Sequence, residues 1–171
     1  MKKVIILILA VAGCAFTSMA QKFALIDMEY VLENIPSYEI ANEQINQLSQ
    51  QWQAEVEVIN KQAADLYKDY QTNMVFLTDE QKKKKEQEIT AKEKEAAELR
   101  NKYFGPEGDL FKFRQQLMSP IQENVYNAVK SVCDERGYQC IFDRASSVDI
   151  IFASPKIDIS DEVLAKLGYS K

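Results

Sequence analysis

Few residues of this chain could carry out chemistry. The chain contains no histidine, so His-based acid–base catalysis, Ser-His or Cys-His nucleophiles and His-containing zinc sites are excluded. Asp27, Asp143 and Asp149 could suggest paired carboxylates, but they lack metal-ligand spacing, and we interpret them as helix caps and turn residues. The residue inventory therefore argues against an enzyme and indicates neither a metal nor a cofactor.

Two cysteines, Cys133 and Cys140, lie across a predicted helix end and strand start. In an oxidising compartment they could form a disulfide, if the turn at Gly137 brings them close enough. The alternative is two small buried hydrophobic side chains. No C-x-x-C motif is present, which argues against redox catalysis.

The first twenty residues predict export. A basic start is followed by the uncharged run Val4 to Ala12, which is too short to span a bilayer, and by the small-residue ending Ser18-Met19-Ala20. This pattern is typical of a signal peptide, residues 1–20, cleaved after Ala20. The alternative is a bacterial lipobox at Val11 to Cys14, which would place a lipid on Cys14.

The charge balance of the mature chain argues against nucleic acid as a partner. Residues 1–20 contain Lys2 and Lys3 and no acids, so 19 basic and 26 acidic side chains remain and the net charge is −7. Proteins that bind nucleic acids concentrate positive charge instead.

The middle of the chain predicts long helices. No glycine or proline occurs from Ser37 to Phe104, and apolar residues recur there at spacings of three or four. The first helix is expected to run for about 35 residues, roughly 50 Å at 1.5 Å per residue. Its apolar positions are Ala41, Ile45, Leu48, Trp52, Val56, Ile59, Ala63, Leu66, Tyr70 and Met74.

A turn and a second helix follow. Thr78 and Gln81 have the spacing of a capping box, so the second helix is expected to begin near Asp79, after a turn at Val75 to Leu77. Its first part, Lys82 to Lys94, carries only Ile89 and Ala91 as apolar residues and can bury little. The segment "FGPEGD", residues 104–109, is expected to interrupt or kink the helix.

The two ends of the chain predict a small sheet. A β-prone run covers Lys22 to Met28, and after Gly137 the segments "YQCIFDR" and "VDIIFAS" predict a β-hairpin with its turn at Ala145 to Ser147. Ser160 is expected to cap a last short helix. Because a lone strand is unstable, the first strand must pair with the late ones.

The expected fold is α+β and mostly helical, in a single domain over residues 21–171. The chain ends, residues 21–36 and 133–171, form a small β-sheet or barrel body, and residues 37–132 form a long antiparallel helical hairpin arm. Such a small body exposes strand edges and an apolar face, so we expect it to oligomerise.

Three segments resemble the Skp/OmpH family of periplasmic chaperones. They are "FALIDMEYVLENIP", "PIQENVYNAVKSV" leading into "GYQCIFDRASSVDIIFAS", and "DISDEVLAKLG", in this order around a long charged hairpin. The resemblance implies a β-barrel body made by three chains, with three helical hairpins around a cavity. It also implies an ATP-independent holdase for unfolded outer-membrane proteins, located in the periplasm.

The resemblance places the middle segment at the free tip of the arm. There Met74, Val75, Phe76 and Leu77 either contact clients or pack on themselves to close the turn. Tyr67 and Tyr70 are further client-binding candidates, although with Trp52 they are better suited to joining the two helices. The basic tip, Lys82, Lys83, Lys84 and Lys85, is either a solvated face or a contact for anionic lipid or lipopolysaccharide.

The strand residues Leu25, Ile141, Phe142, Ile150 and Phe152 are expected to form the body core and the trimer contacts. A different function remains open, namely a structural coiled-coil envelope protein or adaptor, lipid-anchored through Cys14. A spacer of that kind should keep a continuous apolar stripe, and the return helix loses its stripe between Lys82 and Lys94.

Overall fold

The computed structural model describes residues 22–146 and 150–169. It contains two compact units, one of residues 1–34 with 125–171, here called the chain-end unit, and one of residues 35–124, the hairpin unit. Residues 125–132, which the sequence analysis assigned to the arm, belong to the chain-end unit. The boundary falls inside one continuous helix, α5 (Asp109–Arg136).

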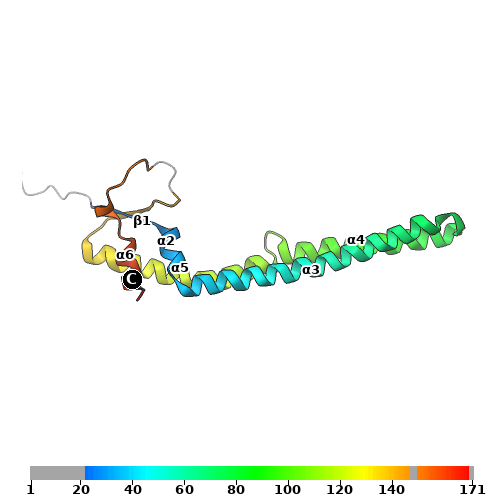
Figure 1. The fold of residues 1–171 in the computed structure, drawn as a ribbon, viewed down its shortest axis with the longest axis horizontal. Helices are drawn as coiled ribbons and strands as arrows, with labels where there is room; N and C mark the ends of the chain where they lie inside the picture. Colours follow the sequence, from blue (N-terminus) through cyan, green and yellow to red (C-terminus); the bar gives the residue numbers. More distant parts are fainter. Residues whose placement is uncertain (1–21, 147–149, 170–171) are drawn as a thin grey trace, which may run out of the picture. The chain divides into compact units, whose positions relative to one another are not determined.

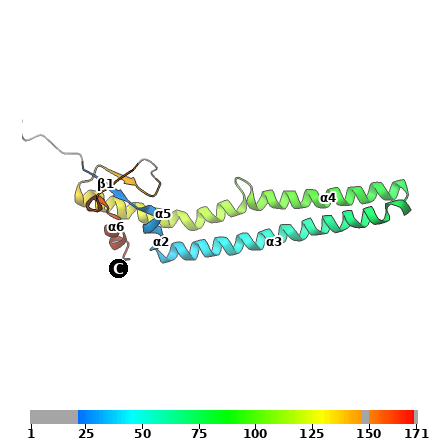
Figure 2. The same ribbon diagram turned by 45° about the horizontal axis from the view of Figure 1, so that its top comes forward.

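The hairpin unit is built around two long helices, α3 (Pro36–Asn73) and α4 (Asp79–Phe104), which lie side by side (Figure 2). The predicted first helix is confirmed. Pro36 occupies its first turn, where the missing N–H has no intrahelical partner to lose. Later residues of α3 contact earlier residues of α4. Trp52 contacts Tyr103, whereas Asp69 contacts Lys85.

Few residues of α3 and α4 are buried, and their number falls toward the connection between the two helices. The fully buried positions are Ala41, Ile45, Val56 and Ala63 on α3, and Ile89 and Ala96 on α4. Within residues 64–88, all of them described, none is buried. The predicted loss of the apolar stripe in the first part of the return helix is therefore present in the fold.

The connection between the two helices is fixed by local hydrogen bonds. The 3₁₀ turn η1 (Met74–Phe76) leads to Thr78, whose side chain accepts from the Gln81 N–H at 3.3 Å. The Gln81 side chain in turn accepts from the Thr78 N–H at 2.9 Å, which confirms the capping box.

The predicted interruption at residues 104–109 is also confirmed, because α4 ends at Phe104 and α5 begins at Asp109. Glycine is needed in this loop. A Cβ on Gly108 would lie 2.7 Å from the Tyr103 carbonyl oxygen, too close for any other residue without a backbone shift.

The chain-end unit joins the two ends of the sequence, as predicted. Strand β1 (Phe23–Ile26), labelled in Figure 1, pairs in parallel with β2 (Cys140–Asp143). In the register of this pair, Phe23 lies opposite Cys140 and Ile26 opposite Asp143. The other elements of the unit are α2 (Met28–Glu33), the 3₁₀ turn η2 (Pro155–Ile157) and α6 (Ser160–Lys166). Its core consists mainly of Ala24, Leu25, Ile26, Val31, Val125, Ala128, Val132, Ile159, Val163 and Leu164.

The predicted β-hairpin after Gly137 is wrong in the described residues. Residues 144–146 turn, but residues 150–154 are not a strand, and the sheet of the described chain has two parallel strands rather than three. Residues 147–149 lie outside the described residues. The β-branched and aromatic residues of "VDIIFAS" show only that the segment suits a strand, whereas its pairing depends on tertiary contacts.

The predicted cap of the last helix is corrected as well. The N-cap of α6 is Ile159, and Ser160 is the first helical residue. The Ser160 N–H donates to the Asp158 carboxylate at 2.9 Å, while its hydroxyl accepts from the Asp27 N–H at 2.9 Å. Ser160 therefore links α6 to the end of β1 instead of capping its own helix.

Candidate functional site

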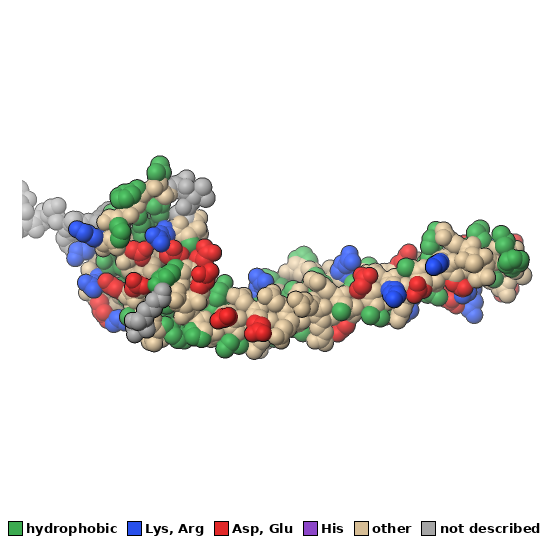
Figure 3. Space-filling view, in the orientation of Figure 1, with side chains coloured by type: hydrophobic (Ala, Val, Ile, Leu, Met, Phe, Trp, Pro, Cys, Tyr) green, Lys and Arg blue, Asp and Glu red, His purple; other side chains and the backbone are tan. Residues whose placement is uncertain are grey.

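Exposed apolar side chains lie at the end of the hairpin unit where η1 connects α3 and α4 (Figure 3). Val75 is 77% exposed and Phe76 is 83% exposed, while Met74 is partly exposed and Leu77 half-buried. The turn is closed by the capping box and by a bond from the Leu77 N–H to the Met74 carbonyl. Its conformation therefore does not depend on packing of Val75 and Phe76, whose apolar area faces solvent.

The four lysines after the turn divide into two pairs. Two of them form ion pairs: Lys82 Nζ lies 3.7 Å from Asp79 Oδ1, and Lys85 Nζ lies 3.1 Å from Asp69 Oδ2 on α3. Lys83 and Lys84 are exposed and make no ion pair among the described residues. Exposed ion pairs contribute about 0–1 kcal/mol, so these lysines matter more for the local positive charge than for stability.

The two tyrosines near the turn differ in their surroundings. The Tyr70 hydroxyl donates to the Glu86 carboxylate on α4 at 2.6 Å, and this hydrogen bond raises the pKa of Tyr70. Tyr67 is half exposed. Tyr70 thus joins the two helices, whereas Tyr67 presents its ring to solvent.

An aromatic contact further along the hairpin unit ties α3 to α4. The rings of Trp52 and Tyr103 are stacked with centroids 4.6 Å apart, and the Tyr103 hydroxyl donates to Glu55 at 2.7 Å. That hydrogen bond raises the pKa of Tyr103. The sequence predicts Trp52 in the helix contact but not Tyr103 as its partner, because helical spacing does not tell which residues of two helices lie opposite each other.

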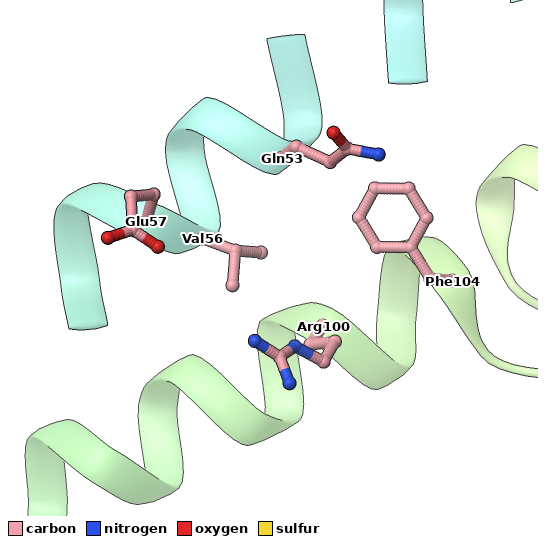
Figure 4. Close-up of a pocket in the computed structure, with 5 residues that line it drawn as sticks. All are labelled: Gln53, Val56, Glu57, Arg100 and Phe104. Carbon is pink, nitrogen blue, oxygen red and sulfur yellow. The ribbon is translucent and has the colours of Figure 1, made fainter. Parts of the chain in front are cut away.

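A groove of about 290 Å³ lies between α3 and α4 next to this contact (Figure 4). Sequence reasoning missed it. It is lined by Gln53, Val56 and Glu57 from α3 and by Arg100 and Phe104 from α4. Val56 and Glu57 follow Gln53 by three and four residues, and Phe104 follows Arg100 by four, which places each set on one face of its helix. The sequence gives no signal for this groove, because helical spacing does not show how two helices are aligned.

The five predicted body residues do not share one environment. Leu25 is buried, Ile141 and Ile150 are half-buried, and Phe142 and Phe152 are exposed. The ring of Phe142 meets that of Phe23 edge to face at 6.5 Å, and Ile151 beside Phe152 is 99% exposed. Only Leu25 of the five is a core residue of the single chain, so the chain-end unit presents an apolar surface.

The aspartates of the chain-end unit serve as caps and turn residues, as interpreted. The Asp27 side chain accepts from the Tyr30 N–H at 2.9 Å and from the Arg144 guanidinium at 2.9 Å. These two bonds, the Tyr30 bond first, lower the pKa of Asp27. Asp143 accepts from the Met28 and Ala145 N–H groups. Asp149 lies outside the described residues.

Cys133 and Cys140 have free thiols in this structure. Cys133 is half-buried and Cys140 is exposed, so the expectation of two buried side chains is wrong for Cys140. Burial is the main cause that raises the pKa of the Cys133 thiol.

The predicted signal peptide and the lipobox cysteine, Cys14, lie outside the described residues. In the part of the chain that the structure describes, no helix combines the length and hydrophobicity that a bilayer span requires.

Comparisons with known proteins agree on one family. The family model described as "Outer membrane protein (OmpH-like)" matches residues 22–167. A solved structure from Caulobacter crescentus CB15, described as a candidate outer membrane chaperone (OmpH-like), is similar to this chain with a TM-score of 0.66. The two share 14% sequence identity, over 86% of this chain and 83% of the other. No curated protein matches the chain.

Proposed function

This chain belongs to the OmpH-like family of outer membrane proteins, and from that premise we propose that it is an ATP-independent holdase chaperone. Its clients are unfolded outer-membrane β-barrel proteins, which it keeps from aggregating. A holdase needs no reaction chemistry. It binds the unfolded chain and not the folded product, which lowers the free concentration of the species that aggregates.

The exposed tip of the hairpin unit carries this proposal. Val75 and Phe76 are among its most exposed large apolar side chains, and they are held there by a turn that closes without them. The adjoining helices bury no residue between 64 and 88, so little packing opposes their bending. Apolar side chains on an adaptable support suit a binder of many different unfolded sequences.

The proposed assembly is a homotrimer held by the chain-end units. The exposed side chains of Phe142, Ile151 and Phe152 give this unit an apolar surface. Strand β2 pairs with β1 on one side, and no strand lies beside its other edge in the described residues. Two-stranded sheets are marginal by themselves, and additional copies would cover both the edge and the apolar side chains.

The proposed location is the periplasm, reached through the predicted signal peptide. In that compartment the exposed Lys83 and Lys84 could contact the head groups of anionic lipids or lipopolysaccharide, since exposed basic side chains are attracted to negatively charged membrane surfaces.

The alternative is a structural envelope protein or adaptor with a coiled-coil spacer, lipid-anchored through Cys14. A spacer derives its stiffness from a continuous apolar stripe. The absence of buried residues in the described segment 64–88 argues for the holdase instead.

An aggregation assay tests the proposed function. An unfolded outer-membrane β-barrel protein is diluted out of urea without nucleotide, and its light scattering is followed with and without the mature protein. We expect scattering to fall as the protein approaches stoichiometric amounts, while ovalbumin at the same concentration has no effect. Unchanged scattering would contradict the holdase and favour the adaptor.

A further inference from the structure

We infer that the groove lined by Gln53, Val56, Glu57, Arg100 and Phe104 binds an extended segment of an unfolded polypeptide through one aromatic side chain. This inference rests on the proposed holdase function and gives it a second contact site, away from the exposed tip.

The floor of the groove is apolar. Val56 is only 4% exposed, and Phe104 is held by an edge-to-face contact with Tyr103 at 6.3 Å between ring centroids. Figure 4 shows Phe104 reaching from the last turn of α4 toward Gln53 on α3. Because aromatic rings prefer stacked or edge-to-face partners, Phe104 favours an aromatic ligand over an aliphatic one.

The rim of the groove is polar and largely unused within the chain. Arg100 and Glu57 are exposed and form no ion pair among the described residues. Gln53 makes one weak bond, to the Ser49 hydroxyl at 3.4 Å. Arg100 offers donors only, Glu57 acceptors only, and the Gln53 amide offers both.

These groups match the chemistry of an unfolded chain. Each non-proline residue of an extended segment carries one backbone N–H and one C=O without an intrachain partner, and the rim can pair with these groups. A folded barrel has already paired these groups between its strands, and its aromatic girdles lie at the membrane interfaces. The groove therefore discriminates between the unfolded client and the folded product.

The groove has room for one aromatic side chain. Its volume of about 290 Å³ is just below the range of roughly 300–1,000 Å³ of small-molecule sites. Strands of outer-membrane barrels carry aromatic residues in two girdles, so an unfolded barrel offers several such side chains in alternating sequences.

The test uses two blocked nonapeptides labelled with fluorescein at the N-terminus. One has a central phenylalanine among alternating threonine and glycine, and the other has serine in its place. We expect the anisotropy of the phenylalanine peptide to saturate with the wild-type protein, and the serine peptide to bind at least tenfold more weakly. The same titration with unlabelled peptide should shift the emission of Trp52, the only tryptophan of the chain, which stacks on Tyr103 beside Phe104.

Two variants locate the site. Gln53→Phe fills the groove from its rim and should weaken binding of the phenylalanine peptide at least tenfold. Gln62→Phe places the same side chain at an exposed position on the opposite face of α3 and should bind as wild type. Circular dichroism confirms that both variants keep the wild-type helix content. Arg100→Gln is a second substitution at an exposed rim residue and should weaken binding of the phenylalanine peptide severalfold.

The groove is not the binding site if the two peptides bind equally well. The same conclusion follows if Gln53→Phe and Arg100→Gln both bind the phenylalanine peptide as well as wild type does. Equal loss in Gln53→Phe and Gln62→Phe would also exclude the groove. The proposed function is judged separately by the aggregation assay. A wild-type protein that suppresses aggregation without binding the phenylalanine peptide keeps its function and loses this site.

Discussion

The indole ring of Trp52 lies flat against the ring of Tyr103, with their centroids 4.6 Å apart and their planes only 4° apart. This contact joins α3 to α4 immediately before α4 ends at Phe104. Between Trp52 and the turn at Met74, the only buried residues of α3 are Val56 and Ala63. The stack thus holds α3 and α4 together at one end, and beyond it the two helices are loosely packed.

Removing the stack should loosen the hairpin unit. Tyr103→Ala loses an aromatic contact worth about 0.5–1.5 kcal/mol beyond its buried area, and also the hydrogen bond to Glu55. We expect a red-shifted Trp52 emission and faster hydrogen exchange of the α4 backbone amides. Tyr126→Ala is the matched control, because Tyr126 is two-thirds exposed and should change neither signal. Equal protection of α4 in both variants would show that the stack contributes nothing.

Replacing Val75, Phe76 and Leu77 with serine should weaken holdase activity while leaving helicity and oligomeric state nearly unchanged. Each side chain contributes roughly 1–2 kcal/mol if a client buries it fully. The half-time of client aggregation measures the effect. Thr90→Ser, at an exposed position within α4, serves as the control for a neutral change in the same unit. A serine variant that holds clients as well as wild type but melts several degrees lower would assign these residues to the turn alone.

The trimer should depend on the chain-end unit and not on the tip of the hairpin unit. Deleting Gln71 to Lys92 removes the turn and should leave the mass in sedimentation equilibrium at three chains. Replacing Ile151 and Phe152 with aspartate should yield monomers, because both side chains are exposed in the single chain and would become charged where copies meet. A wild-type protein that sediments as a monomer at micromolar concentration contradicts the assembly.

The chain-end unit should lose stability in acid through Asp27. Its pKa lies below the usual value, first through the Tyr30 N–H and then through Arg144, so the folded state favours the carboxylate. The resulting stabilisation is present above the unfolded pKa of about 3.9 and is lost as pH falls through the lower folded value. Asp27→Asn keeps an oxygen that can cap α2 but loses the charge facing Arg144.

Urea midpoints at pH 7, 5 and 3 measure this effect. The difference between wild type and Asp27→Asn should be largest at pH 7 and should shrink at pH 3. Glu33→Gln changes an exposed acid at the end of α2 and should give no such trend. A difference that stays constant with pH would mean that the charge of Asp27 plays no part.

The sequence by itself determined the elements whose cause is local. The long helix from Pro36, the capping box at Thr78 and Gln81, and the break after Phe104 follow from spacing, side-chain hydrogen bonds and the Gly-Pro content of a few neighbouring residues. The cap at Asp27 belongs to the same class, because its acceptor and the Tyr30 donor are three residues apart.

The tertiary structure decided everything that depends on residues distant in the chain. Strand pairing is one case, since Phe23 pairs with Cys140 in parallel while residues 150–154, which are also rich in β-branched and aromatic residues, are not a strand in the single chain. The opposition of Trp52 to Tyr103 and the groove beside them depend on how α3 and α4 are aligned, which a helical period leaves free. Periodicity shows which face of an element is apolar, but only packing chooses the partner of that face, because its energy comes from contacts between residues far apart in sequence.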